Sequence, residues 1–234
     1  MRIGIIAEGF SDVAVIRSVV RKLIPAIDSF TLLRPRERFD ETDLQELNFS
    51  NWQLVLESCQ DEHLMSGFFE ELDGEALLVV HIDTAERGEK GFDIQAPMRS
   101  RKTNYSRYSE TLRENVRNKL TTLIPERFQE KIAYAIAIEE TDAWLIPLFE
   151  STRNDTSSHT NAKEMLSYLV GKDKKSKRKF IDTDRKILDY QKLGKELAKA
   201  LHQARNHNKS LDLFCIDLEE KSKNFKTNSS TISK

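Results

Sequence analysis

The sequence predicts an α/β fold: a Rossmann-like parallel sheet flanked by helices, with a helical C-terminal third. Three observations support this class. Apolar runs at residues 2–7, 76–82 and 132–138 have the length of buried strands. Helical patterns separate these runs, and the order strand, helix, strand favours parallel pairing. After residue 150 the pattern is helical, with no convincing strand.

The first half of the chain alternates strands and helices. Residues 2–7 form the first strand, and the turn Glu8-Gly-Phe-Ser-Asp12 follows, in which Gly9 is free to take a positive φ angle. Ser11 or Asp12 can cap the next helix, which Pro25 ends. The later segments are expected as strand or loop at 28–50, mostly helix at 51–73, strand at 76–82, a polar loop at 84–104, helix at 105–124 and strand at 132–138.

The second half is expected to be mostly helical. Ala143 to Phe149 begin a helix that Pro147 breaks, and further helices are expected at 162–170, 190–202 and 211–221. We therefore divide the chain into three parts. These are an α/β domain at 1–150, a basic helical extension packed on it at 151–223, and a flexible polar tail at 224–234.

Charge is distributed unevenly along the 234 residues, whose net charge is −1. Residues 172–209 hold 13 Lys and Arg against 5 Asp and Glu, and 210–234 hold 4 of each, which leaves −9 for 1–171. An acidic body with a basic third suits a metal site beside a polyanion-binding surface, although a solvated helix face explains any single lysine. We expect nucleic-acid phosphate contacts at Arg99, Arg101, Lys102, Lys174, Lys175, Lys177, Arg178 and Lys179.

Other features exclude several classes of protein. No apolar run approaches the roughly 20 residues that span a bilayer, and the first residues lack the apolar region of a signal peptide. We expect a cytoplasmic protein with no membrane partner. Cys59 and Cys215 are far apart and are expected to be buried hydrophobic residues in a reducing compartment. The five histidines lack metal-site spacing, which argues against zinc.

Acidic residues follow each of the three clear strands: Glu8, then Asp83, then Glu140 with Asp142. Ligands of open parallel sheets bind beyond the carboxyl ends of the strands, so these acids converge if the strands are neighbours. Clustered carboxylates repel one another unless a cation lies among them, and an all-oxygen cluster suits Mg²⁺ or Mn²⁺. We predict that these four acids are the catalytic and metal-binding residues, with secondary ligands at Asp12, Glu86 and Glu139.

Each of these acids also has an ordinary structural explanation. Glu8 can belong to a simple turn before a capped helix, and Asp83 to the turn that ends a strand. Glu140 and Asp142 can complement the positive end of a helix dipole. Trp144, beside them, is expected to lie in the core rather than to stack on a base.

At these acids the chain resembles the TOPRIM superfamily, the catalytic fold of topoisomerases, bacterial primases and several nucleases, over about residues 1–150. Glu8 in Glu-Gly-Phe-Ser-Asp matches the glutamate after the first strand, and Asp83 in His-Ile-Asp-Thr-Ala-Glu matches the first acid of the second motif. The third stretch, Glu-Glu-Thr-Asp-Ala-Trp-Leu, is similar to the Glu-x-Glu-Ala-x-Leu element of small stand-alone TOPRIM proteins beside bacterial phage-defence genes. The usual second motif is Asp-x-Asp, whereas here Ala85 replaces the second acid and Glu86 stands one residue further on.

The resemblance implies a Mg²⁺-dependent nuclease that acts on DNA or on an RNA such as tRNA, as a toxic effector of antiphage defence. The related OLD-type nucleases carry an ATPase on the same chain. This sequence has no Gly-x-x-x-x-Gly-Lys-Ser/Thr motif, so a separate ATPase is the expected partner. A homodimer stays open. Two other functions also stay open: an idle TOPRIM-like module that docks on an ATPase or nucleic acid, which Ala85 favours, and a flavodoxin-like response domain, which acids after three strands disfavour.

Overall fold

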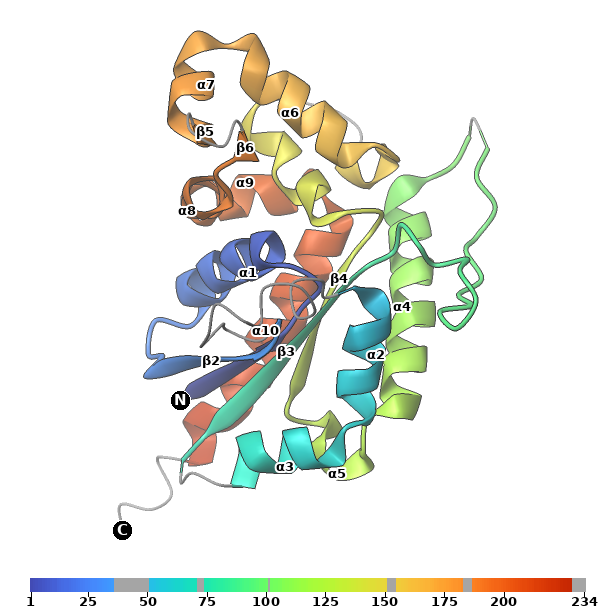
Figure 1. The fold of residues 1–234 in the computed structure, drawn as a ribbon, viewed down its shortest axis with the longest axis vertical. Helices are drawn as coiled ribbons and strands as arrows, with labels where there is room; N and C mark the ends of the chain where they lie inside the picture. Colours follow the sequence, from blue (N-terminus) through green and yellow to red (C-terminus); the bar gives the residue numbers. More distant parts are fainter. Residues whose placement is uncertain (36–50, 71–73, 101, 151–154, 183–186, 229–234) are drawn as a thin grey trace, which may run out of the picture.

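A computed structural model describes residues 1–35, 51–70, 74–100, 102–150, 155–182 and 187–228. It confirms a mixed α/β fold with a four-stranded parallel sheet flanked by helices (Figure 1). The strands are β1 (Arg2–Ile6), β2 (Ser29–Arg34), β3 (Ala76–Asp83) and β4 (Ile132–Ala137). They lie in the order β2-β1-β3-β4, and every neighbouring pair is parallel.

The three clear strands of the sequence are neighbours in the sheet. Ile6 of β1 pairs with Val80 of β3, and Asp83 at the end of β3 pairs with Ala137 of β4. Because all three run the same way, their carboxyl ends meet at one edge of the sheet. β2 occupies part of the segment expected as strand or loop, and residues 36–50 lie outside the described part.

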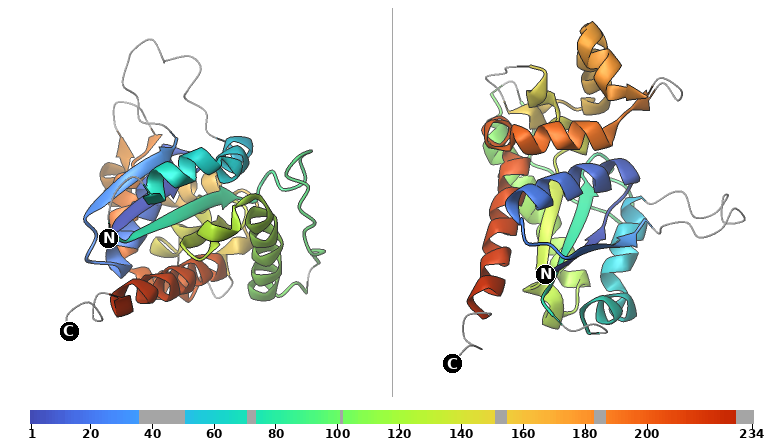
Figure 2. Two further views of the ribbon diagram at one scale, coloured as in Figure 1. Left: turned by 90° about the horizontal axis from the view of Figure 1, so that it is seen from below. Right: turned by 90° about the vertical axis from the view of Figure 1, so that its left-hand side faces the viewer.

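Helices cover both faces of the sheet, as the three views show (Figures 1 and 2). One face is covered by α1 (Phe10–Leu23) and α10 (Lys209–Asn228), with α8 (Tyr190–Lys199) packed against α1. The other face is covered by α2 (Trp52–Gln60), α3 (Glu62–Glu70) and α4 (Tyr105–Leu123). Within β3, Leu77 and Val79 join the first core while Leu78 and Val80 join the second. Burial on both faces explains why the strands are apolar almost throughout.

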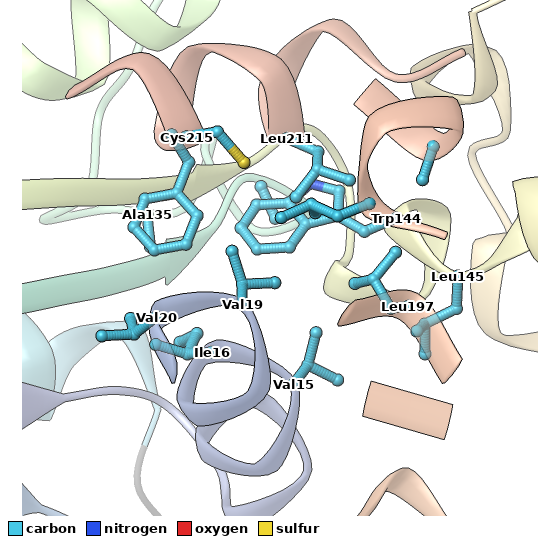
Figure 3. Packing of buried hydrophobic residues seen from close by; sticks show 14 of the residues in the cluster. Val15, Ile16, Val19, Val20, Ala135, Trp144, Leu145, Leu197, Leu211 and Cys215 are labelled. Atoms are coloured by element: carbon cyan, nitrogen blue, oxygen red, sulfur yellow. The ribbon is translucent and has the colours of Figure 1, made fainter. Parts of the chain in front are cut away.

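Trp144 lies at the centre of the first core, between α1, α8 and α10 (Figure 3). Its ring stacks on Phe214 with 5.6 Å between centroids, and its Nε1 donates a hydrogen bond to Ser210 Oγ at 2.8 Å. Trp144 is therefore a core residue, as expected. The core is continuous across residue 150, where we placed the domain boundary, because α10 lies against β4.

The segments near and beyond residue 150 lie mostly above the carboxyl edge of the sheet in Figure 1. The 3₁₀ helices are η2 (Thr141–Trp144), η3 (Ile146–Leu148) and η4 (Thr156–Ser158). The remaining helices are α5 (Glu126–Gln129), α6 (Ala162–Lys172), α7 (Lys174–Phe180) and α9 (Leu201–Arg205). None of the described helices is long and apolar enough to cross a membrane. Cys59 and Cys215 are both buried and unpaired, as expected.

Several local predictions were wrong. Helix α1 begins at Phe10 with Gly9 as its N-cap, at φ −145° and without a side-chain cap, so neither Ser11 nor Asp12 caps it and Gly9 does not use a positive φ angle. The helix expected at 143–149 is replaced by 3₁₀ turns, since Pro147 has no N–H to donate. Two-residue strands β5 (Ile181–Asp182) and β6 (Ile187–Leu188) pair in the C-terminal third. Helix α10 continues through Asn228 into the segment expected as a tail, and 229–234 lie outside the described residues.

Candidate metal centre and active site

The topology places a reversal point between the carboxyl ends of β1 and β3. From β1 the chain passes through α1 to β2 on one side, and from β3 it passes through α4 to β4 on the other. Since α1 and α4 cover opposite faces, the direction of winding reverses between β1 and β3. Open α/β sheets bind their ligands at this reversal, where Glu8 and Asp83 lie.

Glu8, Asp12 and Asp83 converge at this reversal point. Glu8 Oε1 accepts a hydrogen bond from the Asp83 N–H at 2.7 Å. Asp12 is buried in the first turn of α1, and ligand atoms of Asp12, His81 and Asp83 all lie within 4.8 Å of one another. A Cβ atom at Gly9 would come to 3.1 Å from Asp12 Oδ2, so the glycine leaves room for this carboxylate.

His81 and Thr141 hold the Asp83 carboxylate in place. Asp83 Oδ1 accepts hydrogen bonds from the Thr141 N–H and hydroxyl, both at 3.1 Å. The Thr141 hydroxyl lies 2.7 Å from Nε2 of His81, which is fully buried and 3.2 Å from the same Asp83 oxygen. Because the hydroxyl proton is donated to Asp83, Nε2 of His81 donates to the hydroxyl oxygen. His81 therefore positions Asp83, and its protonated Nε2 is not free to bind a metal.

The third motif contributes one carboxylate to the cluster and leaves another at its margin. Asp142 is buried, and its Oδ1 accepts a hydrogen bond from the Tyr190 hydroxyl of α8 at 2.7 Å. Glu140 Oε2 accepts from the Lys163 N–H at 3.0 Å, in the first turn of α6. Part of Glu140 thus serves a helix N-terminus, and burial raises its pKa.

The cluster carries more negative charge than its surroundings can balance. Burial, together with the charge of Asp83, raises the pKa of Glu8 to about 8. Burial also raises the pKa of Asp142 to about 7 and that of Asp12 to about 6. Burial lowers the pKa of His81, but the neighbouring carboxylates raise it more strongly and bring it to about 9. Without a cation these acids therefore resist ionisation, which is the electrostatic pattern of a functional site.

Glu139 is a buried acid of the opposite kind. Its carboxylate lies 3.0 Å from Arg87 and also pairs with Arg99. Arg99 additionally lies over the Tyr108 ring, 4.6 Å from its centroid. Glu139, predicted as a secondary ligand, is thus held by two guanidinium groups, and Arg99, predicted to contact phosphate, is held by internal partners.

The remaining predicted residues are mostly exposed. Glu86 is mostly exposed beside Asp83. Partial burial of its carboxyl group, together with the charge of Asp83, raises its pKa. Lys102 is exposed, and Arg101 lies outside the described residues. The basic run forms α7, on which Lys179 pairs with Glu196 at 3.0 Å. The four other predicted contacts on α7 are exposed to solvent, namely Lys174, Lys175, Lys177 and Arg178.

Sequence reasoning missed His81, Thr141 and Tyr190. His81 had a usable signal, because it interrupts an apolar strand two residues before Asp83 and so shares its face. Tyr190 had none, since 48 positions separate it from Asp142.

Comparisons with protein-family models, curated proteins and solved structures return no match. The resemblance to TOPRIM proteins therefore stays a prediction that rests on the sequence motifs.

Proposed function

We propose that this protein is a metal-dependent nuclease that hydrolyses phosphodiester bonds at the reversal point between β1 and β3. One observation carries the proposal. Glu8, Asp12, Asp83 and Asp142 gather at the reversal point of the sheet, and within the described ranges none of them forms an ion pair with Lys or Arg. Such a set of oxygen donors fits Mg²⁺ or Mn²⁺.

Each residue of the cluster has a role in this proposal. Asp12 and Asp83 would hold the ion, with Asp142 and Glu140 on the side of η2. A bound ion would supply positive charge to the phosphate oxygens and would lower the pKa of a water molecule. Glu8 uses Oε1 to accept the Asp83 N–H, which leaves Oε2 to accept or return a proton. His81 and Thr141 keep Asp83 oriented.

The motif resemblance supports the wider part of the proposal. The protein would act in the cytoplasm on DNA or on an RNA such as tRNA, as a toxic effector of antiphage defence. An ATPase would control it, as the resemblance to OLD-type nucleases implies.

The decisive experiment incubates the purified protein with tRNA, single-stranded DNA and plasmid DNA in the presence of Mg²⁺ or Mn²⁺. Each reaction is run with and without an ATPase encoded by an adjacent gene. We expect cleavage by the wild type and a loss of about 100-fold or more for Glu8→Gln, because the amide cannot transfer the proton. Glu57→Gln, at an exposed position of α2, is the matched control and should keep full activity. Equal activity of wild type and Glu8→Gln would contradict the proposal.

Ala85 favours a second candidate function, a catalytically idle module that binds nucleic acid or an ATPase. Its methyl group is exposed beside Asp83 and offers no oxygen to an ion. The variant Ala85→Asp distinguishes the two functions. If the wild type cleaves nothing while Ala85→Asp gains metal-dependent cleavage, the natural site is idle for want of this carboxylate.

A further inference from the structure

A basic groove of about 470 Å³ lies where α1, α7 and α8 meet, away from the carboxylates. In Figure 2 the two long helices of this region, α1 and α8, run side by side. Six cationic side chains and a single carboxylate line the groove: Arg21, Lys22, Lys179, Lys192, Lys195, Lys199 and Glu196. Surfaces of one charge sign in a concave setting attract and concentrate ligands of the opposite sign.

Close contact between two helices builds the groove. A Cβ atom at Gly194 of α8 would lie 2.8 Å from Ser18 Oγ and 3.0 Å from the Ala14 carbonyl oxygen of α1. The glycine therefore lets the two backbones approach. Lys192, Lys195 and Lys199 follow the spacing of one face of α8, and this approach brings that face beside α1.

Internal partners balance only part of this charge. Glu196 pairs with Lys179 at 3.0 Å and with Lys199 at 2.7 Å. Lys192 pairs with Asp189 at 2.9 Å. Lys22 and Lys195 are exposed and form no ion pair with any residue that the structure describes. The groove thus keeps an excess of cations that point to solvent.

Two of the helices that line the groove also connect it to other parts of the candidate site. Helix α8 begins at Tyr190, which bonds Asp142 of the cluster, and reaches Lys199 about 14 Å further along its axis. Lys179 belongs to α7, which carries the exposed lysines of the basic run. The positive charge therefore extends past a single phosphate-sized site, which favours an elongated polyanion.

We propose that the groove between α1 and α8 binds the phosphodiester backbone of a nucleic acid whose scissile bond lies at the carboxylate cluster. This inference rests on the proposed function, because it assigns a binding track to that site. It adds Lys22, Lys192 and Lys195 to the phosphate contacts expected from the sequence, of which Lys179 also lines the groove. Glu196 limits the affinity, since it neutralises two of the lysines.

The test measures binding of a labelled single-stranded oligonucleotide in EDTA, so that no cleavage occurs, over a series of salt concentrations. We expect the double variant Lys22→Gln/Lys195→Gln to bind more weakly and to lose about 1.4 from the log–log salt slope, because two phosphate contacts disappear. The matched control, Lys90→Gln/Lys131→Gln, removes two exposed lysines elsewhere and should keep the wild-type slope. Glu196→Gln should bind more tightly with a steeper slope, which a purely structural role would not produce.

Three outcomes would overturn the groove assignment: equal slope changes in the groove and control variants, no oligonucleotide binding by the wild type, or binding to vesicles of phosphatidylglycerol alone. These outcomes are separate from failure of the proposed function. If cleavage depends on Glu8 but the groove variant keeps the wild-type salt slope, the nuclease proposal stands and the groove assignment is rejected. If the groove variant has a smaller salt slope but the wild type cleaves nothing, the groove assignment stands and the idle binding module is favoured.

Discussion

The acids at the carboxyl ends of the strands are treated in two opposite ways by the fold. Glu139 is enclosed by Arg87 and Arg99, which neutralise it. Asp12 is also buried and Glu8 is partly buried, yet Asp83 repels both of them, while His81 acts in the opposite direction. Glu139 is balanced by the protein itself, whereas His81 balances only part of the charge of the other three acids, and the rest needs a cation or protons.

The difference separates acids that hold the structure from acids that are available for chemistry. The backbone of Glu139 accepts hydrogen bonds from the N–H groups of Thr84 and Ala85, at 3.0 and 3.1 Å, and so ties the end of β4 to the end of β3. Its paired side chain anchors the loop of Arg87 and Arg99 to the same point. The fold thus uses one neutralised acid to position the ends that present Asp83.

The largest effect on stability is expected when the same substitution, Glu to Gln, is made at the two kinds of acid. Glu139→Gln should lower the free energy of unfolding by about 3 kcal/mol, because it leaves two mostly buried guanidinium groups without their carboxylate. Glu8→Gln should leave it unchanged or raise it, since the amide oxygen can still accept the Asp83 N–H and the repulsion disappears. Urea unfolding of the metal-free proteins measures both.

A surface pair provides the control for that comparison. Glu114 lies 3.9 Å from Arg117 on the exposed side of α4, so Glu114→Gln should change the stability by no more than about 0.5 kcal/mol. Equal destabilisation by Glu8→Gln and Glu139→Gln would show that the two kinds of acid do not differ.

Metal ions should act on one set of acids only. Mg²⁺ or Mn²⁺ at 100 times its dissociation constant should stabilise the wild type by about 2.7 kcal/mol, seen as a higher melting temperature. Asp83→Asn should lose this gain because it removes one of the proposed ligands. Glu114→Gln is the control that should retain it. A wild-type melting temperature that does not respond to millimolar metal would argue against the metal centre.

The pH dependence of the metal-free protein sharpens the comparison further. Folded Glu8, Asp142 and Asp12 keep their protons to pH values of about 8, 7 and 6, above those of the unfolded chain, and His81 stays protonated to about 9. The folded state then binds more protons than the unfolded state, so the free energy of unfolding should fall as pH rises from 6 to 8. Urea titrations at these two pH values measure the fall, and saturating Mg²⁺ should reduce it. A rise in stability over this interval would contradict the assignment.

The smallest expected effect concerns the hydroxyl that contacts the cluster from α8. Tyr190→Phe removes the hydrogen bond to Asp142 and should destabilise the protein by about 1 kcal/mol. Tyr168→Phe, at a position with 61% exposure, is the matched control and should have no measurable effect. Because Asp142 loses a donor that favours its charged form, its pKa should also rise, which NMR titration of the carboxyl carbon can follow.

The sequence was most informative where burial on both faces left a continuous apolar run. The strands that became β1, β3 and β4 were therefore predictable, and so was the convergence of Glu8 and Asp83. β2 was not, because it lies at the edge of the sheet and its residues alternate between exposed and partly buried. The strands β5 and β6 have two residues each, too few to produce a periodic pattern.

The site was only partly predictable for a related reason. Acids at strand ends are visible in the sequence, but their partners depend on tertiary contacts. Nothing near Glu139 indicated that Arg87 and Arg99 would pair with it, across 52 and 40 positions. Charge alone therefore identified candidate ligands, while the paired or unpaired state of each acid required the structure.

The position of α10 also constrains how this protein is made. Tyr134 of β4 donates its backbone N–H to Asp217 of α10 at 2.8 Å, and this helix covers one face of the strand. During translation the roughly 70 residues between the end of β4 and α10 take about 4–14 s to synthesise, at typical rates of 5–20 residues per second. Throughout this interval β4 lacks the cover of α10, and the sheet edge that carries the carboxylates lacks a settled core beneath it. A nascent chain whose α10 has not yet emerged therefore holds no finished carboxylate site.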